Sequence, residues 1–312
     1  MQFLSYLING ISLGSVYALI ALGYTMVYGI AKMLNFAHGD VIMIGSYVVF
    51  FAFGSAGMNP VLAIVLSMVV CTLLGVTVER IAYRPLREAP SLAVLITAIG
   101  VSYLLQNLAT YITGGLPQMY PSLPGLSSQI TIAGTSTKMV TVITPFLVVA
   151  LVVVLTQLIN HTKIGMAMRA ASRDFETAQL MGIKINNVIS FTFAVGSFLA
   201  AIGSMMYFSN YTAVTPTVGA MPGLKAFVAA VFGGIGSIPG AVIGGFLIGI
   251  CESLIKGAGA TTFSDAFTFA LLIVVLAPPE LVQEFAAEGT PMLLALLALG
   301  NLSFWLCDRA LT

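Results

Sequence analysis

Few residues in this chain could do chemistry, and most of them stand at the edges of long apolar runs. The 312 residues include only two histidines, His38 and His161, which share no motif, and the zinc-binding pattern H-E-x-x-H is absent. His38 and Asp40 are two positions apart and are candidates for a proton site. We favour a structural role for this pair, in which side-chain bonds to the backbone hold the entry of a helix.

A glycine-rich stretch, Phe232–Gly240, has the composition of a phosphate-binding loop. The pattern G-x-x-x-x-G-K-[ST], which cradles phosphate, occurs nowhere in the chain. We therefore expect no nucleotide or other cofactor in this chain, and we interpret the stretch as short or re-entrant helices that meet inside a membrane. Beyond it, Glu252 and Lys256 stand four residues apart, a spacing that permits an ion pair on a helix. The three cysteines have no ligand spacing, so we predict no metal site.

The composition indicates a membrane protein. Hydrophobic residues make up 59% of the chain and charged residues 7%, and the mean hydropathy is +1.03. A soluble domain carries about 25% charged residues. A net charge of +1 gives no electrostatic support for binding nucleic acid. We therefore expect an all-α polytopic integral membrane protein.

Uncharged runs separated by polar connections predict about 8–10 transmembrane or re-entrant helices. The expected helices lie at about 4–30, 41–53, 60–79, 91–113, 139–160, 188–209, 222–232, 239–255 and 263–277. The second is short for a full crossing, so part of Leu34–Asp40 is expected at membrane depth, where irregular backbone must be buried in protein or line a cavity. Pro222 is expected to open its helix.

The distribution of basic residues predicts the orientation. The connections 79–90 and 161–187 hold seven of the twelve Lys and Arg residues, which places both in the cytoplasm. Two spans separate them, as two connections on one side require. Counting back places the N-terminus outside and Lys32 inside. Gly114–Lys138 becomes an external loop, with short extended structure around 129–132, and is too small for a separate binding domain.

The polar connection 161–187 has the pattern of a short surface helix. Three- and four-residue steps join Met166, Arg169, Arg173, Glu176, Leu180 and Ile183. Gly182 is placed to end this helix. Small residues on its faces would let another protein approach closely, so we interpret the connection as a handle on which a partner acts.

The handle resembles a known motif. Glu176-Thr177-Ala178 followed by Gly182 resembles the EAA…G loop of ABC-importer permeases, which docks into a groove on a cytoplasmic ATPase. Thr177 departs mildly from the alanine of that motif. The resemblance implies that Arg169, Glu176, Ala178 and Gly182 couple the chain to the ATPase. An ordinary solvated loop remains the alternative, because many such loops contain E-x-A.

Several stretches together resemble the LivH-type permease subunit of branched-chain amino-acid ABC importers. They are Asn9–Leu19, Leu34–Asp40, Glu79–Leu86, Ser102–Asn107, the connection 161–187 and Gly223–Gly245. The likeness covers roughly residues 3–276. It implies the ABC-importer permease fold for 1–277, with the coupling loop at 161–187. A divergent tail follows at 278–312, with a possible extra apolar helix at 289–307.

The resemblance also implies the partners. They are ABC ATPase subunits that bind the ATP, a second permease subunit (LivM-like or the same chain) and an extracytoplasmic substrate-binding protein, in the bacterial inner membrane. The chain itself is expected to be a non-catalytic subunit that transports branched-chain or similar small amino acids. A urea- or amide-type ABC permease of the same fold remains an alternative.

Breaks and polar side chains within the spans are the candidates for the transport path, because polar backbone and a zwitterion can coexist there in a membrane. The candidates are Asn35, His38, Gln106, Asn107, Gly233, Gly234 and Gly236. Tight binding in the path would hinder release, so we expect no high-affinity site.

Two other classes of function are weaker interpretations. An ion-coupled secondary carrier would use His38, Asp40 or Glu252 as its ion site. These residues lie at predicted span ends, which argues against that class. A membrane enzyme has the least support, because the two histidines share no motif and pair with no cysteine.

Overall fold

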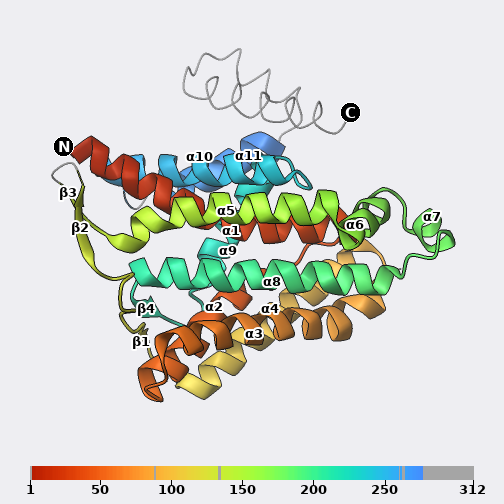
Figure 1. Ribbon diagram of the computed structural model, residues 1–312, viewed down its shortest axis with the longest axis horizontal. Helices are drawn as coiled ribbons and strands as arrows, with labels where there is room; N and C mark the ends of the chain where they lie inside the picture. The colour runs from red at the N-terminus through yellow and green to blue at the C-terminus, as the bar shows by residue number, and fades with distance from the viewer. Residues whose placement is uncertain (1, 88, 133–134, 260, 262–263, 277–312) are drawn as a thin grey trace, which may run out of the picture.

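The structure, a computed structural model, is a bundle of roughly parallel helices (Figure 1) and describes residues 2–87, 89–132, 135–259, 261 and 264–276. The helices are α1 Gln2–Ala31, α2 His38–Val49, α3 Pro60–Val78, α4 Ser91–Thr113, α5 Met139–His161, α6 Lys163–Arg173, α7 Phe175–Leu180, α8 Ile185–Asn210, α9 Ala220–Phe232, α10 Ile238–Gly257 and α11 Ser264–Leu276. A π-helical turn, Phe50–Ser55, extends α2, and the turns Glu79–Tyr83 and Arg84–Leu86 extend α3.

Two short antiparallel strand pairs lie at one end of the bundle (Figure 1). The strand β1 Gln118–Met119 pairs with β4 Ala213–Val214, and β2 Gln129–Ile132 pairs with β3 Thr135–Lys138. The expected extended structure around 129–132 is therefore confirmed. The helices α6 and α7 lie at the opposite end. The connections predicted to be external and cytoplasmic therefore lie at opposite ends, and which end faces the cytoplasm stays a prediction.

The described helices confirm the expected all-α membrane architecture. Seven are long and apolar enough to cross a membrane, and two shorter apolar helices, Ala220–Phe232 and Ser264–Ile273, accompany them. The tail 278–312, with its expected extra helix, lies outside the described residues.

The helix α1 packs very closely against α10. The two helices run antiparallel, and glycines on each face the other. A side-chain carbon on Gly14 would lie 2.8 Å from the Cα of Phe246, and one on Gly10 would lie 2.9 Å from the Cα of Ile250. Both separations are too short for a real contact, so only glycine permits this approach, which is the usual device of helix pairs in lipid.

The helices α2 and α9 begin in the interior of the bundle. A side-chain carbon on Gly39, the second residue of α2, would lie 2.6 Å from the carbonyl oxygen of Gly219 and 3.4 Å from the Cα of Gly223 in α9. His38 packs against Gly23, which lies well inside α1. The connection between α1 and α2 therefore returns into the protein as irregular backbone, as expected for Leu34–Asp40.

The pair α8–α9 repeats the pair α1–α2 with inverted direction. In each pair a long helix crosses the bundle, the chain turns back into the interior, and a second helix starts there. The helix α2 ends near the strands, where Gly54 approaches Pro121, whereas α9 ends toward the opposite end, where Gly236 approaches Gly29 of α1. Such inverted repeats are typical of membrane transporters.

Two details of the prediction were wrong. The connection 161–187 holds two helices and not one, because Asp174 ends α6 and caps the N-terminus of α7. Its carboxylate accepts the hydroxyl of Thr177 and, at 2.9 Å, the backbone N–H of Glu176. The bond from the Thr177 hydroxyl is the main cause of a lowered pKa for Asp174. In addition, Pro222 does not open α9, which begins at Ala220.

Candidate functional site

The interior start of α2 is one of four sites that the fold assembles. Asp40 is buried, and its Oδ1 accepts a hydrogen bond of 2.9 Å from Nε2 of Gln106 in α4. Asn35 is also buried, and its Oδ1 accepts a bond of 2.9 Å from the hydroxyl of Tyr83. These bonds tie the re-entrant connection to α4 and to the end of α3.

His38 and Asp40 are held at the start of α2 in different ways. The His38 side chain bonds to the backbone of Ile20, as expected of a structural role. The N-cap of α2 has no side-chain bond, so Asp40 holds α2 through the Gln106 side chain and not through backbone. Both residues are almost completely buried, at 1% and 2% exposure, as is Glu252 at 1%. As expected, His38 and Asp40 lie at the start of the apolar helix His38–Ser55, and Glu252 lies near the end of α10. Their burial comes from the surrounding helices and, for His38, from the irregular connection that carries the start of α2 into the bundle.

The other predicted path residues lie apart from this site. Asn107 is on the exposed face of α4 and donates a hydrogen bond of 2.7 Å to the carbonyl oxygen of Tyr103 in its own helix. Gly233, Gly234 and Gly236 form the turn between α9 and α10, in which Gly234 and Gly236 have positive φ angles of 85° and 102°. The seven candidates therefore do not form one cluster, and their place in a path stays a prediction.

The glycine turn meets the predicted handle at the second site. A small cavity of about 110 Å³ is lined both by Gly236 and by Arg169, Met168 and Ser172 of α6. The Arg169 side chain is held by α5, because its Nη1 donates a hydrogen bond of 2.9 Å to Oδ1 of Asn160 in that helix. The sequence did not reveal that Arg169 and the glycine turn are neighbours.

The third site is a groove at the end of the bundle that carries α6 and α7, with a volume of about 600 Å³. It is lined by Ala31, Met33, Arg84, Pro85, Arg87, Phe175, Glu176, Gln179, Ile185, Asn186 and Ile189. Of the predicted coupling residues, Glu176 faces this groove, and Ala178 is buried and seats α7 on the bundle. Leu180 and Met181 are 87% and 80% exposed at the tip of α7. These two exposed apolar side chains are candidates for contact with a partner.

A backbone motif ends α7 beside this groove. Gly182 has a φ of +83°, and its N–H donates to the carbonyl oxygen of Gln179 at 2.9 Å. The next N–H, of Ile183, donates to the carbonyl oxygen of Ala178 at 3.1 Å. These two bonds form the Schellman motif, which requires a left-handed residue. The expectation that Gly182 ends the helix is confirmed.

A buried ion pair fixes the far wall of the groove. Glu79 is completely buried, and its two carboxylate oxygens bind Arg87 and, at 2.5 Å, the hydroxyl of Ser190. Arg87 also donates to the side chain of Asn186. The end of α3 is thereby clamped to the start of α8.

The fourth site is a charge cluster between α1, α9, α10 and α11. The carboxylate of Glu252 accepts bonds from Lys225 at 2.7 Å, from Lys256 at 2.6 Å and from the Tyr17 hydroxyl at 2.9 Å. Lys225 also pairs with Asp265 at 2.6 Å. The predicted pair of Glu252 and Lys256 is confirmed. We did not identify Lys225 from the sequence, although it is the only charged residue between Lys184 and Glu252.

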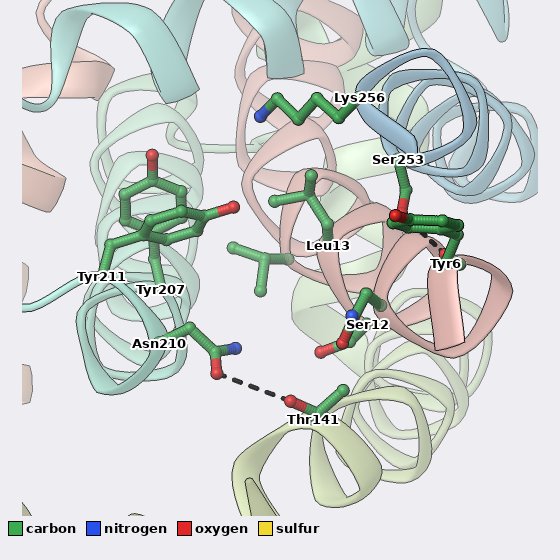
Figure 2. Close-up of a pocket in the computed structure, with 11 residues that line it drawn as sticks. Tyr6, Ser12, Leu13, Thr141, Tyr207, Asn210, Tyr211, Ser253 and Lys256 are labelled. Carbon is green, nitrogen blue, oxygen red and sulfur yellow. Dashed lines mark hydrogen bonds between the residues drawn. The ribbon is translucent and has the colours of Figure 1, made fainter. Parts of the chain in front are cut away.

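A cavity of about 340 Å³ opens beside this cluster, between α1, α5, α8 and α10 (Figure 2). Its lining comprises Tyr6, Asn9, Ser12, Leu13, Val16, Thr141, Tyr207, Asn210, Tyr211, Ser253 and Lys256. In Figure 2 the amine of Lys256 extends from α10 across the cavity. Tyr207 of α8 and Tyr211, the residue directly after α8, lie on the opposite side. The wall is therefore mixed, with polar groups on both sides of the apolar side chains.

Ser12 in this cavity belongs to a stretch, Gly10–Gly14, that spells G-x-S-x-G. In hydrolases this pattern forms a sharp turn between a strand and a helix, which exposes the serine. Here the stretch lies inside α1, and its two glycines pack against α10. The pattern therefore serves helix packing. Among the described residues, no three His, Cys, Asp or Glu side chains lie close enough to hold a metal ion.

Comparison with known proteins decides the family. The model of the family "Branched-chain amino acid transport system / permease component" matches residues 6–276. The chain belongs to this family. The resemblance to LivH-type permeases is thereby confirmed, and membership together with the seven long apolar helices makes the chain a multi-pass inner-membrane protein.

The relatives of this family member are similar along most of their length. The high-affinity branched-chain amino acid transport system permease protein LivH of Escherichia coli (strain K12) is 42% identical over 290 residues, which cover 88% of this chain and 93% of LivH. The corresponding permease protein BraD of Pseudomonas aeruginosa is 41% identical over 287 residues, with the same shares covered. Among solved structures, PsaBC from Streptococcus pneumoniae in complex with Fab covers 88% of this chain and 91% of its own at 12% identity and a TM-score of 0.44, a likeness too weak to carry an argument.

Proposed function

We propose that this chain is the permease subunit of an ATP-driven importer for branched-chain or similar small amino acids. The observation that carries the proposal is the family match over residues 6–276, supported by the 42% identity to the branched-chain amino acid permease protein LivH. The chain supplies the translocation path and no catalytic chemistry. It contains no G-x-x-x-x-G-K-[ST] loop, so ATP is bound and hydrolysed by partner subunits.

The partners follow from this division of labour. Two ATPase subunits act from the cytoplasm, and a second permease subunit, either LivM-like or a second copy of this chain, completes the path. An extracytoplasmic binding protein captures the substrate, because the external loop Gly114–Lys138 is too short to do so. The permease domain is assigned to 1–277 and its coupling loop to 161–187.

Coupling is assigned to the groove beside α7. The exposed tip of α7, with Leu180 and Met181, offers apolar contacts to an ATPase, and Glu176 lines the groove next to it. Arg169 in α6 contacts the same small cavity as Gly236, so movement of the handle acts directly on the turn between α9 and α10. Binding of ATP in the partners biases two arrangements of the helices, which gives alternating access.

One observation favours a second candidate, an ion-coupled carrier. His38, Asp40 and Glu252 are buried within the bundle, where carriers hold their ions. Two of them are already engaged, because Asp40 is bonded to Gln106 and Glu252 is bonded to two lysines. We therefore favour the ATP-driven importer.

Reconstitution tests the proposal. The permease pair is inserted into liposomes with its ATPases, and the binding protein and radiolabelled leucine are added on the external side. We expect uptake that requires ATP and continues after ionophores collapse the proton and sodium gradients. Uptake without ATP that ionophores abolish would establish the carrier instead, and import of urea in place of leucine would establish the amide-type permease.

A further inference from the structure

We infer that the cavity between α1, α5, α8 and α10 is a weak binding site for a free α-amino acid with an apolar side chain, whose carboxylate is held by Lys256. The inference rests on the proposed function and assigns a substrate contact within the chain. The volume of about 340 Å³ lies within the range of ligand pockets, about 300–1,000 Å³.

Lys256 has donors to spare for a ligand. An ammonium group carries three N–H donors, and within the described part of the chain Lys256 is bonded to Glu252 alone. Lys225 differs, because it has Asp265 as a second partner and is almost completely buried. The Lys256 side chain is 36% exposed and lines the cavity. It is therefore the cation that a carboxylate entering the cavity would meet.

The charge balance of the cluster predicts weak binding. Lys225 and Lys256 carry two positive charges, and Glu252 and Asp265 carry two negative charges, so the four groups are neutral together. Lys256 therefore attracts a carboxylate only in competition with Glu252. A transport path benefits from such a contact, because the substrate must leave again.

A buried hydroxyl supplies independent evidence for a polar ligand. Ser12 lines the cavity at 2% exposure, and its Oγ has no hydrogen-bond partner. An unsatisfied buried hydroxyl is costly, and an ammonium group of a ligand would satisfy it. Asn210 is a second acceptor, since its Oδ1 receives only a long bond of 3.5 Å from Thr141. Figure 2 shows Ser12 and Asn210 on the side of the cavity away from Lys256.

The remaining wall suits an apolar side chain. Leu13 and Val16 line the cavity from α1, and the stacked rings of Tyr207 and Tyr211 line it from the other side, with centroids 4.6 Å apart. A zwitterion with a branched aliphatic side chain therefore finds a cation, two acceptors and an apolar surface in one space.

Protection from thiol labelling tests the site. Asn9, which lines the cavity and is exposed, is changed to Cys in a background without the three native cysteines. Cells express the permease pair and ATPases without the binding protein, and a small membrane-impermeant thiol reagent is added outside. With a Kd of about 1 mM, ~10 mM leucine should slow labelling about tenfold. Isoamylamine, which lacks the carboxylate, should not protect, and Ser128→Cys in the external loop should label equally with and without leucine.

Variants at position 256 identify the carboxylate contact. Lys256→Met should abolish protection by leucine, whereas Lys256→Arg, which keeps the charge, should retain it in part. Glu252 keeps Lys225 as its partner in both variants. If Lys256→Met does not insert, the comparison of leucine with isoamylamine in the unchanged site decides alone. Equal protection by both compounds, undiminished protection in Lys256→Met, or none by leucine would overturn the inference. ATP-driven leucine uptake by the unmodified importer, measured separately, tells a failure of this site from a failure of the proposed function.

Discussion

Substitution of Gly182 offers the sharpest test of coupling, because the structure separates two effects of a side chain there. A side chain on Gly182 would meet nothing within 4 Å, so the isolated chain has room for it. The φ of +83° is the other constraint. A left-handed conformation costs an ordinary L-residue roughly 1–2 kcal/mol. The equilibrium for the Schellman turn should therefore weaken by a factor of about 5–30.

Three variants distinguish strain from bulk at this position. Gly182→Leu adds both, Gly182→Ala adds strain with little bulk, and Gly182→Asn adds bulk with less strain because asparagine tolerates this conformation. We expect Gly182→Leu to lose ATP-driven leucine uptake and co-purification with the ATPase. Its abundance in the membrane should stay normal, because the residue is exposed outside the spans. Loss in Gly182→Asn as well would identify bulk at the docking surface as the cause, and loss in Gly182→Ala would identify the turn.

A second substitution, at another residue of the α7 surface, tests whether the whole surface and not Gly182 alone is needed for coupling. Glu176 is exposed and lines the groove, so Glu176→Lys should reduce uptake by charge reversal without disturbing packing. Normal uptake in both Gly182→Leu and Glu176→Lys would refute the assignment of α7 as the coupling element.

Four further predictions follow from the fold. Cysteine placed at Ser128 should react with an impermeant reagent added outside, and cysteine at Arg173 should not; the reverse pattern would invert the orientation. Gly14→Leu should remove the protein from the membrane, because α10 leaves no room, whereas Gly100→Leu should be as abundant as the original since nothing lies within 4 Å of that position; equal abundance of the two would contradict the packing. Glu79→Ala leaves Arg87 without its buried partner and should destabilise the protein by about 3 kcal/mol, measured as a lower thermal midpoint in detergent; an unchanged midpoint would show that the clamp is dispensable. The purified chain alone should show no saturable leucine binding in the micromolar range by equilibrium dialysis, and a stoichiometric micromolar site would support the carrier.

The sequence predicted the helices well, because hydropathy and helix boundaries depend on local composition. The glycine face of α10 was also predictable, since small residues four positions apart have few other uses in a membrane helix. The break at Asp174 was missed for a physical reason. The three- and four-residue steps continue across it, and the helix is interrupted where the carboxylate of Asp174 accepts bonds from the backbone N–H of Glu176 and the hydroxyl of Thr177.

The candidate sites were less predictable, because they depend on contacts between distant segments. Lys225 stands among apolar residues, and its neighbours in the sequence do not indicate that it forms ion pairs with residues of α10 and α11. The depth of His38 follows from the fold of an irregular connection, which has no periodicity to detect. Asn107 shows the converse, since a polar residue in an apolar run lies on the exposed face of α4 and bonds its own helix.

The glycine contact between α1 and α10 has a mechanical consequence. At Gly10 and Gly14 the backbone lies directly against the backbone of α10, so at these positions no side chain can change rotamer and allow the two helices to slide. The pair should therefore move as one rigid body, and the rearrangements of a transport cycle must involve the two helices that begin in the interior, α2 and α9. Positions along the contact between α1 and α10 should tolerate substitution poorly whatever solute is carried. Substitutions on α7 should affect transport only when the ATPase is bound.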